Sequence, residues 1–303
     1  MRAPNSHTAA SILGLAMATT TLFAQPAFGQ RQWLGPEPVV GAGSTEPPGA
    51  TTSGPHGVDI VYSGPNGHLY WQWATSPGVY TTPVDLNDVG ATSGVSLVAH
   101  ARNKLDALYR GKNQRLWTSW WDGTWWSAPT DLGGVQLKSA PTAVRGGPHK
   151  LDVFYVDQLD RLRLSYWDGG PYWSAPAEFP ISKVKGPVAV VTTGPHKVDV
   201  FYRSLDNRLW HFWSDGGPWS APQNRGTVIT SNPSGASLLN PARTLAAVYY
   251  RNNIGSLCVL LSSKRGAWVS ECSGIKVGEK LSAITVDEVF VMQRNATFRI
   301  WRK

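Results

Sequence analysis

The chain has 303 residues and a formal net charge of +8, and only 16% of its residues are charged. With 15 Trp and 42% hydrophobic residues, the composition excludes an intrinsically disordered protein. The 28 Lys and Arg are scattered without a basic run or a known nucleic-acid motif, which argues against nucleic acid as a partner.

Residues 1–29 predict a secretory signal peptide. Arg2 supplies an early positive charge, an uncharged run rich in Ala, Leu and Thr follows, and Ala27-Phe28-Gly29 places small residues at positions −3 and −1 of a cleavage site. The apolar core is too short for a membrane anchor, and no other segment is long enough to span a bilayer. A disordered tail is the alternative. We therefore expect one domain over residues 30–303, secreted into the extracellular space or the periplasm.

The rest of the chain repeats one pattern, which is clearest in residues 198–222. Val198–Arg203 and Leu209–Trp213 are two runs of β-branched and aromatic residues separated by a polar turn. The Asp215-Gly216-Gly217 turn supplies the positive φ that tight hairpins need. A third strand is expected to open at Trp219, so the stretch predicts a β-meander.

Six copies of this pattern occupy the chain, with a period between about 40 and 50 residues. In each copy a strand acid, or its substitute, is followed ten residues later by a large apolar residue. The first position is Asp59, Asp106, Asp152, Asp199, Ala247 and Glu288. The second position is Leu69, Leu116, Leu162, Leu209, Leu257 and Phe298. The repeats lie near 48–90, 91–135, 136–182, 183–229, 230–276 and 277–303.

A small apolar run before each meander, such as residues 186–193, adds a fourth strand. Four-stranded antiparallel units at this period are the blades of a β-propeller, so the fold class is all-β. The sixth copy has no outer strand of its own, and residues 31–37, with Trp33 one period before Tyr80, match the missing piece. We therefore predict a six-bladed ring in which the N-terminal strand completes the last blade and removes the open sheet edges.

The two cysteines, Cys258 and Cys272, flank a turn centred on Arg265 in the fifth copy. A hairpin folded there places them opposite each other, and export permits oxidation, so we expect a disulfide. Two free buried thiols are the alternative. In the chain-entropy model such a bond contributes about 3 kcal/mol.

Two repeated residue types are interpreted as structural. The Trp of the Trp-Ser-Ala-Pro motif persists even in degenerate copies, which favours packing between blades over ligand contact. We expect the strand acid to accept hydrogen bonds from neighbouring backbone donors or from a strand Arg. Because blades stack face to face, the central strands are expected to be apolar on both faces.

The pattern LDVFYR-x-x-D-N-R-L-W-x-x-x-W-x-D-G-G-x-W-S-A-P, kept best in residues 105–222, resembles the repeat of the PLL-type propeller lectins of bacteria and of the related tectonin-like repeats. The resemblance implies a secreted sugar-binding propeller. Fucose and O-methylated sugars are typical ligands of that group, held in shallow pockets between neighbouring blades. Its members usually have seven blades, so a seven-bladed ring is the alternative to the six counted here.

Sugars present C–H faces that stack on aromatic rings and hydroxyl groups that need fixed polar partners. The candidate platforms are Tyr70, Trp73, Trp117, Trp120, Tyr166, Trp210 and Trp213. The candidate polar partners are Arg110, Arg203, His149 and His196, with Arg251 and His56 as further members of the same two sets. Core packing is the alternative role of the aromatic residues, and turn formation is that of the histidines. The fifth and sixth copies lack Trp here and are expected to bind nothing.

An enzyme is a weaker interpretation, because the acids recur once per blade whereas a catalytic pair is singular. The Ser-x-Asp-x-Gly-x-x-Trp box of sialidases is missing and no cluster has metal-ligand spacing, so we expect neither a metal nor another cofactor. A non-catalytic propeller that binds a protein or a cell-wall partner is the main alternative to a glycan-binding lectin, and a glycosidase is the last. In a lectin the aromatic candidates should be partly exposed in clefts between blades, whereas in a scaffold they should be buried.

Overall fold

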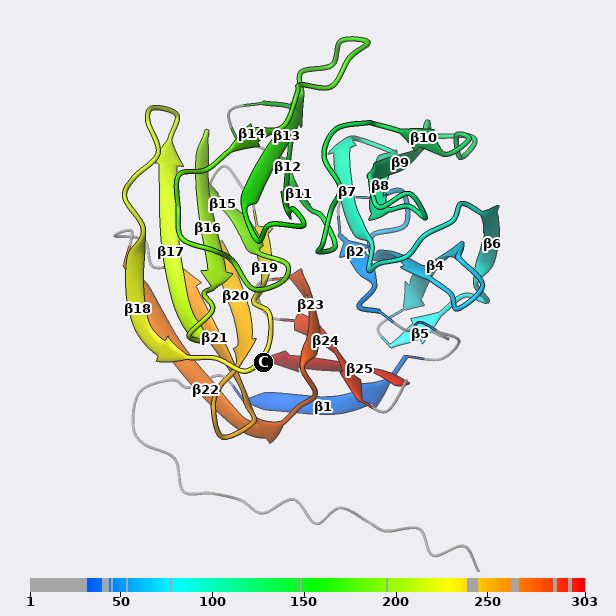
Figure 1. Ribbon diagram of the computed structural model, residues 1–303. Coiled ribbons are helices and arrows are strands. Elements are labelled where there is room, and N and C mark those ends of the chain that lie inside the picture. Colours follow the sequence, from blue (N-terminus) through cyan, green and yellow to red (C-terminus); the bar gives the residue numbers. More distant parts are fainter. Residues whose placement is uncertain are drawn as a thin grey trace, which may run out of the picture. The chain divides into compact units, whose positions relative to one another are not determined.

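The structure, a computed structural model, describes residues 32–302 apart from 40–43, 45, 53, 77, 146, 148, 195, 239–244, 263–266, 286–287 and 294–295. The expected signal peptide lies outside the described residues. Every element of the described chain is a β-strand, and the strands form six antiparallel sheets around a ring (Figure 1). The six-bladed propeller is confirmed and the seven-bladed alternative is wrong. The part of the chain that the structure describes contains no helix long and apolar enough to cross a membrane.

The first three blades follow the chain in order. Blade 1 contains β2 (Gly49–Thr51), β3 (Asp59–Ser63), β4 (His68–Ser76), β5 (Val79–Tyr80) and β6 (Val84–Asp88). Blade 2 contains β7 (Ser96–Ala101), β8 (Lys104–Arg110), β9 (Leu116–Trp121) and β10 (Thr130–Asp131). Blade 3 contains β11 (Thr142–Val144), β12 (Leu151–Val156), β13 (Leu162–Trp167) and β14 (Ala177–Glu178).

The last three blades include the one that closes the ring. Blade 4 contains β15 (Ala189–Gly194), β16 (Lys197–Arg203), β17 (Arg208–Asp215) and β18 (Gln223–Val228). Blade 5 contains β19 (Ser234–Leu238), β20 (Leu245–Arg251), β21 (Ser256–Ser262) and β22 (Trp268–Lys276). Blade 6 contains β23 (Lys280–Thr285), β24 (Glu288–Gln293), β25 (Ala296–Arg302) and, as its outer strand, β1 (Trp33–Pro38).

The predicted N-terminal closure is present. Strand β1 pairs antiparallel with β25, with Trp33 opposite Arg302 and Leu34 opposite Trp301, and Figure 1 shows this first strand beside the last one. The Trp33 indole donates a 2.9 Å hydrogen bond to Glu271 in blade 5. The two ends of the described chain therefore hold the ring shut.

Apolar side chains gather between the blades, as expected for sheets that stack face to face. Each of six buried clusters combines residues of two neighbouring blades, from blades 1 and 2 round to blades 6 and 1. Strands β3 and β12 are buried along their whole length. Because no single sheet has a core of its own, the blades stabilise one another.

The repeated Trp packs against the preceding blade, as predicted. The Trp219 ring lies 5.0 Å from Phe179 of blade 3, and the Trp268 ring lies 4.7 Å from Phe201 of blade 4. In blades 2 to 4, however, the outer strand does not open at this Trp. In blade 4 the strand begins after Pro222, because a proline has no N–H to give to the sheet, and the Ser220 hydroxyl accepts a hydrogen bond from the Trp213 amide instead.

Small and hydroxyl-bearing residues line the inner ring. The Ser96 hydroxyl of blade 2 accepts a hydrogen bond from the Ala143 amide of blade 3, and the Ser234 hydroxyl of blade 5 accepts one from the Ala283 amide of blade 6. A Cβ on Gly49 would lie 2.6 Å from the backbone nitrogen of a strand in blade 2. The inner strands can therefore approach this closely only with such residues.

The expected disulfide is confirmed. Cys258 on β21 lies directly opposite Cys272 on β22, and the two sulfur atoms are bonded. The bond joins the third strand to the outer strand of blade 5, the blade whose repeat is degenerate.

Candidate functional site

Each blade has two ends. The tip end holds the turn between the first and second strands and the connection from the third strand to the outer strand. The linker end holds the turn between the second and third strands and the segment that leads to the next blade. In blade 4, His196 and Gly216 lie at the tip end, whereas Gly186 and Asp206 lie at the linker end.

Buried aspartates at the tip end pair with histidines. His56 Nδ1 lies 2.8 Å from Asp59, and its backbone N–H donates a 3.1 Å hydrogen bond to the same carboxylate. His149 Nδ1 lies 2.6 Å from Asp152. Burial raises the pKa of Asp152, and the hydrogen bond from His149 opposes this rise. Two of the Gly-Pro-His turns therefore supply a partner for the strand acid.

In blades 2 and 4 the histidine comes from a different place in the repeat. His100 on the innermost strand pairs with Asp106, and His211 on the third strand lies 2.7 Å from Asp199. His196, the third Gly-Pro-His histidine, is exposed and has a φ of 58°. Of the two expected partners of the strand acid, the backbone donor is confirmed at Asp59. The expected arginine is wrong, because in all four aspartates an imidazole takes its place.

The strand alternation places the candidate aromatic residues on opposite faces of the blades. One group points toward the preceding blade at the linker end, namely Tyr70, Trp117 and Trp210. The other points toward the following blade at the tip end, namely Trp73, Trp120, Tyr166 and Trp213. Members of the two groups that share an interface, such as Trp73 and Trp117 between blades 1 and 2, lie at its opposite ends.

The linker-end group is held by local packing. The Trp117 indole donates a 2.9 Å hydrogen bond to Asn113, and its ring lies so close to Gly111 that a Cβ there would meet it at 2.5 Å. The Trp210 indole nitrogen is buried without a hydrogen-bond partner. These rings are half-buried, and their polar atoms are held or enclosed by the protein itself.

The tip-end group lies beside the histidines. The Tyr166 ring stacks on His149 at 3.6 Å, and the Trp73 ring stacks on His56 at 4.2 Å. Trp120 is 40% exposed. Imidazoles fixed by a carboxylate thus hold aromatic faces at an end of the blade that is open to solvent.

Four indole rings of blades 1 and 2 lie close together at the tip end, and we call this group the aromatic cleft. Trp71 of blade 1 is buried, and its ring lies 4.9 Å from Trp73, 5.0 Å from Trp121 and 5.6 Å from Trp126, the last two in blade 2. Trp73 and Trp121 are half-buried. The Trp71 indole donates to Asp59, and the Trp121 indole donates a 3.3 Å hydrogen bond to Asn103. Half-exposed Trp73 and Trp121, from two blades, therefore pack against the buried Trp71, whose indole N–H is held by Asp59.

A cavity of about 260 Å³ lies between blades 6 and 1, on the other side of blade 1. His56 and Tyr80 line it from blade 1, and Arg299 lines it from blade 6. The Arg299 guanidinium lies 4.8 Å from the Trp301 ring. The His56 imidazole is stacked on Trp73, so of these three residues the phenol and the guanidinium are the side chains that can bind hydroxyl groups here.

The candidate arginines bridge blades at the linker end. Arg110 donates hydrogen bonds to the carbonyl oxygens of Thr92 and, in the next blade, Lys138. Arg203 donates a 3.0 Å hydrogen bond to Asn232 of blade 5, and burial lowers the pKa of its guanidinium. These two side chains lie apart from the tip-end aromatic residues.

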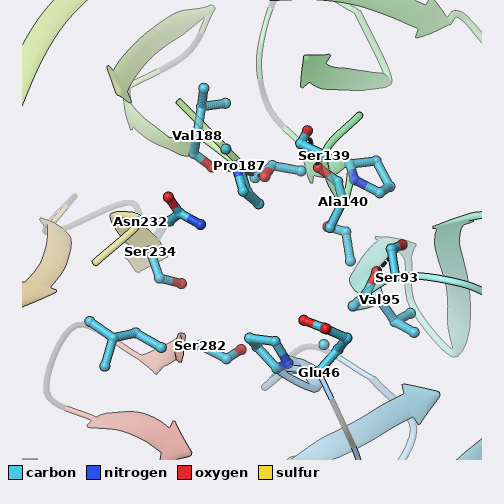
Figure 2. A pocket seen from close by; sticks show the side chains of 18 of the residues that line it. Glu46, Ser93, Val95, Ser139, Ala140, Pro187, Val188, Asn232, Ser234 and Ser282 are labelled. Atoms are coloured by element: carbon cyan, nitrogen blue, oxygen red, sulfur yellow. Dashed lines mark hydrogen bonds between the residues drawn. The ribbon is translucent and has the colours of Figure 1, made fainter. Parts of the chain in front are cut away.

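A cavity of about 470 Å³ opens along the ring axis, with walls from all six blades. Figure 2 shows Glu46, Asn232, Ser234 and Ser282 around it. Glu46 forms a 3.0 Å ion pair with Lys280, and the Ser234 and Ser282 hydroxyls take part in hydrogen bonds between blades. The polar groups of this wall therefore hold the inner strands together.

Sequence reasoning did not single out Trp71, Trp121 or Arg299. Trp71 points toward blade 2, like the candidate Trp73, and Trp121 points toward blade 1, like the candidate Trp117. Arg299 is in a degenerate copy that was expected to bind nothing. Among the described residues, no group of three His, Cys, Asp or Glu has the arrangement of a metal site.

The chain shares its fold with solved structures of lectins. No protein-family model and no curated protein matches the chain. The solved structure of the SapL1 lectin in complex with alpha methyl fucoside matches with a TM-score of 0.64 and 16% identity, over 83% of this chain and 90% of that one. The six-bladed Aleuria aurantia lectin matches with a TM-score of 0.65 and 16% identity, over 85% and 91%. The BP39L lectin of Burkholderia pseudomallei matches with a TM-score of 0.65 and 17% identity, over 80% and 76%.

Proposed function

We propose that the protein is a non-catalytic lectin that binds carbohydrate in clefts between blades at the tip end. The observation that carries the proposal is the aromatic cleft, in which half-exposed Trp73 and Trp121 of two blades flank the buried Trp71. The shared fold of three solved lectin structures supports it.

The cleft has both kinds of group that a sugar needs. An indole face accepts the C–H face of a sugar ring, and the burial of apolar area drives the contact. His56 stacks on Trp73 and binds Asp59 through Nδ1, so its second ring nitrogen is the one available for a hydroxyl group. The Asn103 amide, fixed beside Trp121, is a second polar partner from blade 2.

We further propose that the cavity between blades 6 and 1 is a second, unequal site. Arg299 and Tyr80 line it, and guanidinium and phenol groups can form hydrogen bonds with sugar hydroxyl groups. Several weak sites on one ring would act together on a branched or clustered glycan, because linked sites raise avidity without new contacts.

Fucosylated or O-methylated glycans are the ligands we propose. The SapL1 lectin was solved in complex with alpha methyl fucoside, and the Aleuria aurantia lectin has a novel fucose recognition mode. The apolar C–H face or methyl group of such sugars suits a cleft lined by indoles. We also propose that the chain is secreted. The Cys258–Cys272 disulfide supports export, because such bonds persist in oxidising compartments.

A glycan array probed with the purified protein tests the proposal. We expect binding to fucosylated or methylated glycans, and a loss of about tenfold or more in Trp73→Ala/Trp121→Ala, because each ring contributes on the order of 1 kcal/mol. Leu159→Ala, which removes an exposed side chain at the linker end, is the matched control.

The same experiment also tests two alternatives, a sugar site at the linker end and a propeller that does not bind glycans. If Trp117→Ala/Trp210→Ala abolishes binding while Trp73→Ala/Trp121→Ala does not, the sugars bind at the linker end and the aromatic cleft is not the site. If the folded protein binds no glycan on the array, the lectin is refuted and a propeller that binds a protein or cell-wall partner takes its place.

A further inference from the structure

Three neighbouring blades expose an apolar side chain at the same place. The residue that precedes the packing Trp or Tyr of each outer connection is Val79 in blade 1, Trp125 in blade 2 and Tyr172 in blade 3. Their exposed fractions are 54%, 74% and 84%, and the last two are the largest among the exposed large hydrophobic residues of the described chain. We call these three residues the apolar tips. Rings this exposed contribute little to the fold.

The tip of blade 2 is built to hold its Trp away from the body of the protein. The Asp122 carboxylate accepts 2.8 Å hydrogen bonds from the Thr124 and Trp125 amides, and these bonds lower the pKa of Asp122. Gly123 has a φ of 101°, which a side chain would strain. The next residue, Trp126, is anchored against Trp71. The turn is thus held by hydrogen bonds, while the Trp125 ring is mostly exposed to solvent.

The tip of blade 3 has a related construction. The Trp167 indole donates a 2.7 Å hydrogen bond to the Gly170 carbonyl oxygen and so closes the loop below Tyr172. Trp173 packs against the core between blades 2 and 3. Figure 1 shows the connection between β13 and β14 projecting away from its blade. Tyr172 therefore stands on an anchored, protruding loop.

Basic side chains contact the loops that carry the two aromatic tips: Lys104 donates a hydrogen bond to the Asp122 carbonyl oxygen, and Lys150 lies 5.7 Å from the Trp167 ring. The turns between first and second strands of blades 2 and 3 carry Arg102, Lys104, Arg145 and Lys150. The exposed acids at the same tips are Asp122 and Asp168, while Asp106 and Asp152 are buried and face His100 and His149. The solvent-facing charge of this region is therefore positive, in keeping with the formal charge of +8 of the chain.

We propose that the tip end of blades 1 to 3 docks on the surface of an anionic lipid bilayer, with Trp125 and Tyr172 at headgroup level. Trp and Tyr are the residues that favour this interface, because one part of each ring system is apolar and another forms hydrogen bonds. The surrounding Lys and Arg side chains are attracted to anionic headgroups. Protruding rings without a surrounding cleft fit a soft interface better than a shaped pocket. This inference does not depend on sugar binding.

Co-sedimentation with sugar-free vesicles tests the proposal. We expect the purified protein to bind vesicles of phosphatidylcholine with a third phosphatidylglycerol, more weakly at high salt, and to bind pure phosphatidylcholine several-fold less. Trp125→Ala/Tyr172→Ala should bind the anionic vesicles about tenfold less or worse. Leu205→Ala/Ile254→Ala, which removes two similarly exposed residues at the linker end, should bind like the parent.

Two results would overturn it. Equal vesicle binding by the parent and the Trp125→Ala/Tyr172→Ala variant would show that the apolar tips do not meet lipid. A variant that keeps its vesicle binding but loses affinity for oligosaccharides would make the tips a sugar platform. Because all of these residues are exposed, thermal melting should be unchanged in both variants, and the sugar-free vesicles separate this test from that of the lectin.

Discussion

The buried pair of Asp199 and His211 in blade 4 should be a main determinant of stability. The two residues are 7% and 3% exposed, and the Asp199 carboxylate accepts hydrogen bonds from His211 Nε2 at 2.7 Å and from the Thr193 hydroxyl at 2.6 Å. Asp199→Ala removes both bonds and leaves the imidazole buried beside Phe201, on which it stacks. We expect the substitution to destabilise the fold strongly.

The magnitude follows from the two lost bonds. A hydrogen bond to a charged group contributes about 1.5 to 3 kcal/mol, and a buried donor left without a partner adds a desolvation penalty. Breaking a buried pair by removing one member costs about 3 to 5 kcal/mol. His211 Nδ1 has no hydrogen-bond partner, so in Asp199→Ala the imidazole would be left without any hydrogen bond. We therefore expect a loss of about 3 to 5 kcal/mol in Asp199→Ala.

Blade 5 supplies a matched control, because it carries Ala247 and Val259 at the same two positions of the repeat. The double variant Asp199→Ala/His211→Val installs that apolar pair in blade 4. Removing both partners of a buried polar pair costs less than removing one, so the double variant should be more stable than Asp199→Ala. Urea unfolding followed by tryptophan fluorescence measures both. A loss below about 0.5 kcal/mol in Asp199→Ala, or a double variant less stable than it, would refute the reasoning.

Four further changes test the closure and the packing of the ring. Trp33→Ala should lower the free energy of unfolding by about 2 to 3 kcal/mol in urea, since it removes the indole that joins β1 to blade 5. Cys258→Ala/Cys272→Ala should cost about 3 kcal/mol, read as a lower urea midpoint. Gly49→Ala should cost more than about 2 kcal/mol, because its Cβ would meet backbone 2.6 Å away. Burial raises the pKa of Asp152, so the contribution of this group to stability falls as pH rises from below the unfolded value of about 3.9, and Asp152→Asn should be less destabilising at pH 7 than at pH 3.

The architecture was predictable because the repeat encodes it locally. The ten-residue spacing from strand acid to apolar residue fixes the hairpin between the second and third strands, as in the pairing of Asp199 with Trp213. The match between Trp33 and Tyr80 then identified the closing strand, which the pairing of β1 with β25 confirms. The start of the outer strands was not predictable in the same way, because Pro222 and its equivalents delay the pairing that the Trp signal suggested.

The candidate site was less predictable, because a cleft between blades depends on which face of a strand each residue occupies. Trp117 and Trp120 lie three residues apart in one strand, yet one points to blade 1 and the other toward blade 3. The repeated sequence pattern marks both positions as aromatic but does not show that they lie on opposite faces of the blade. The histidines are a similar case, since His56 and His100 reach equivalent aspartates from different positions, so a search at a single position in the repeat misses half of the pairs.

The blades have diverged toward different roles, and the division follows the chain. Blades 1 to 3 carry the aromatic cleft and the apolar tips, whose half-exposed rings contribute less to folding than buried ones. Blades 5 and 6 lack these rings and instead hold the disulfide and the closing strand β1. Because every core in the ring lies between two blades, a bond that stabilises blade 5 also stabilises its neighbours on both sides. The disulfide in blade 5 and the closing strand β1 in blade 6 thus add stability to the ring. This gain offsets the loss of stability from the Trp and Tyr side chains that blades 1 to 3 expose to solvent.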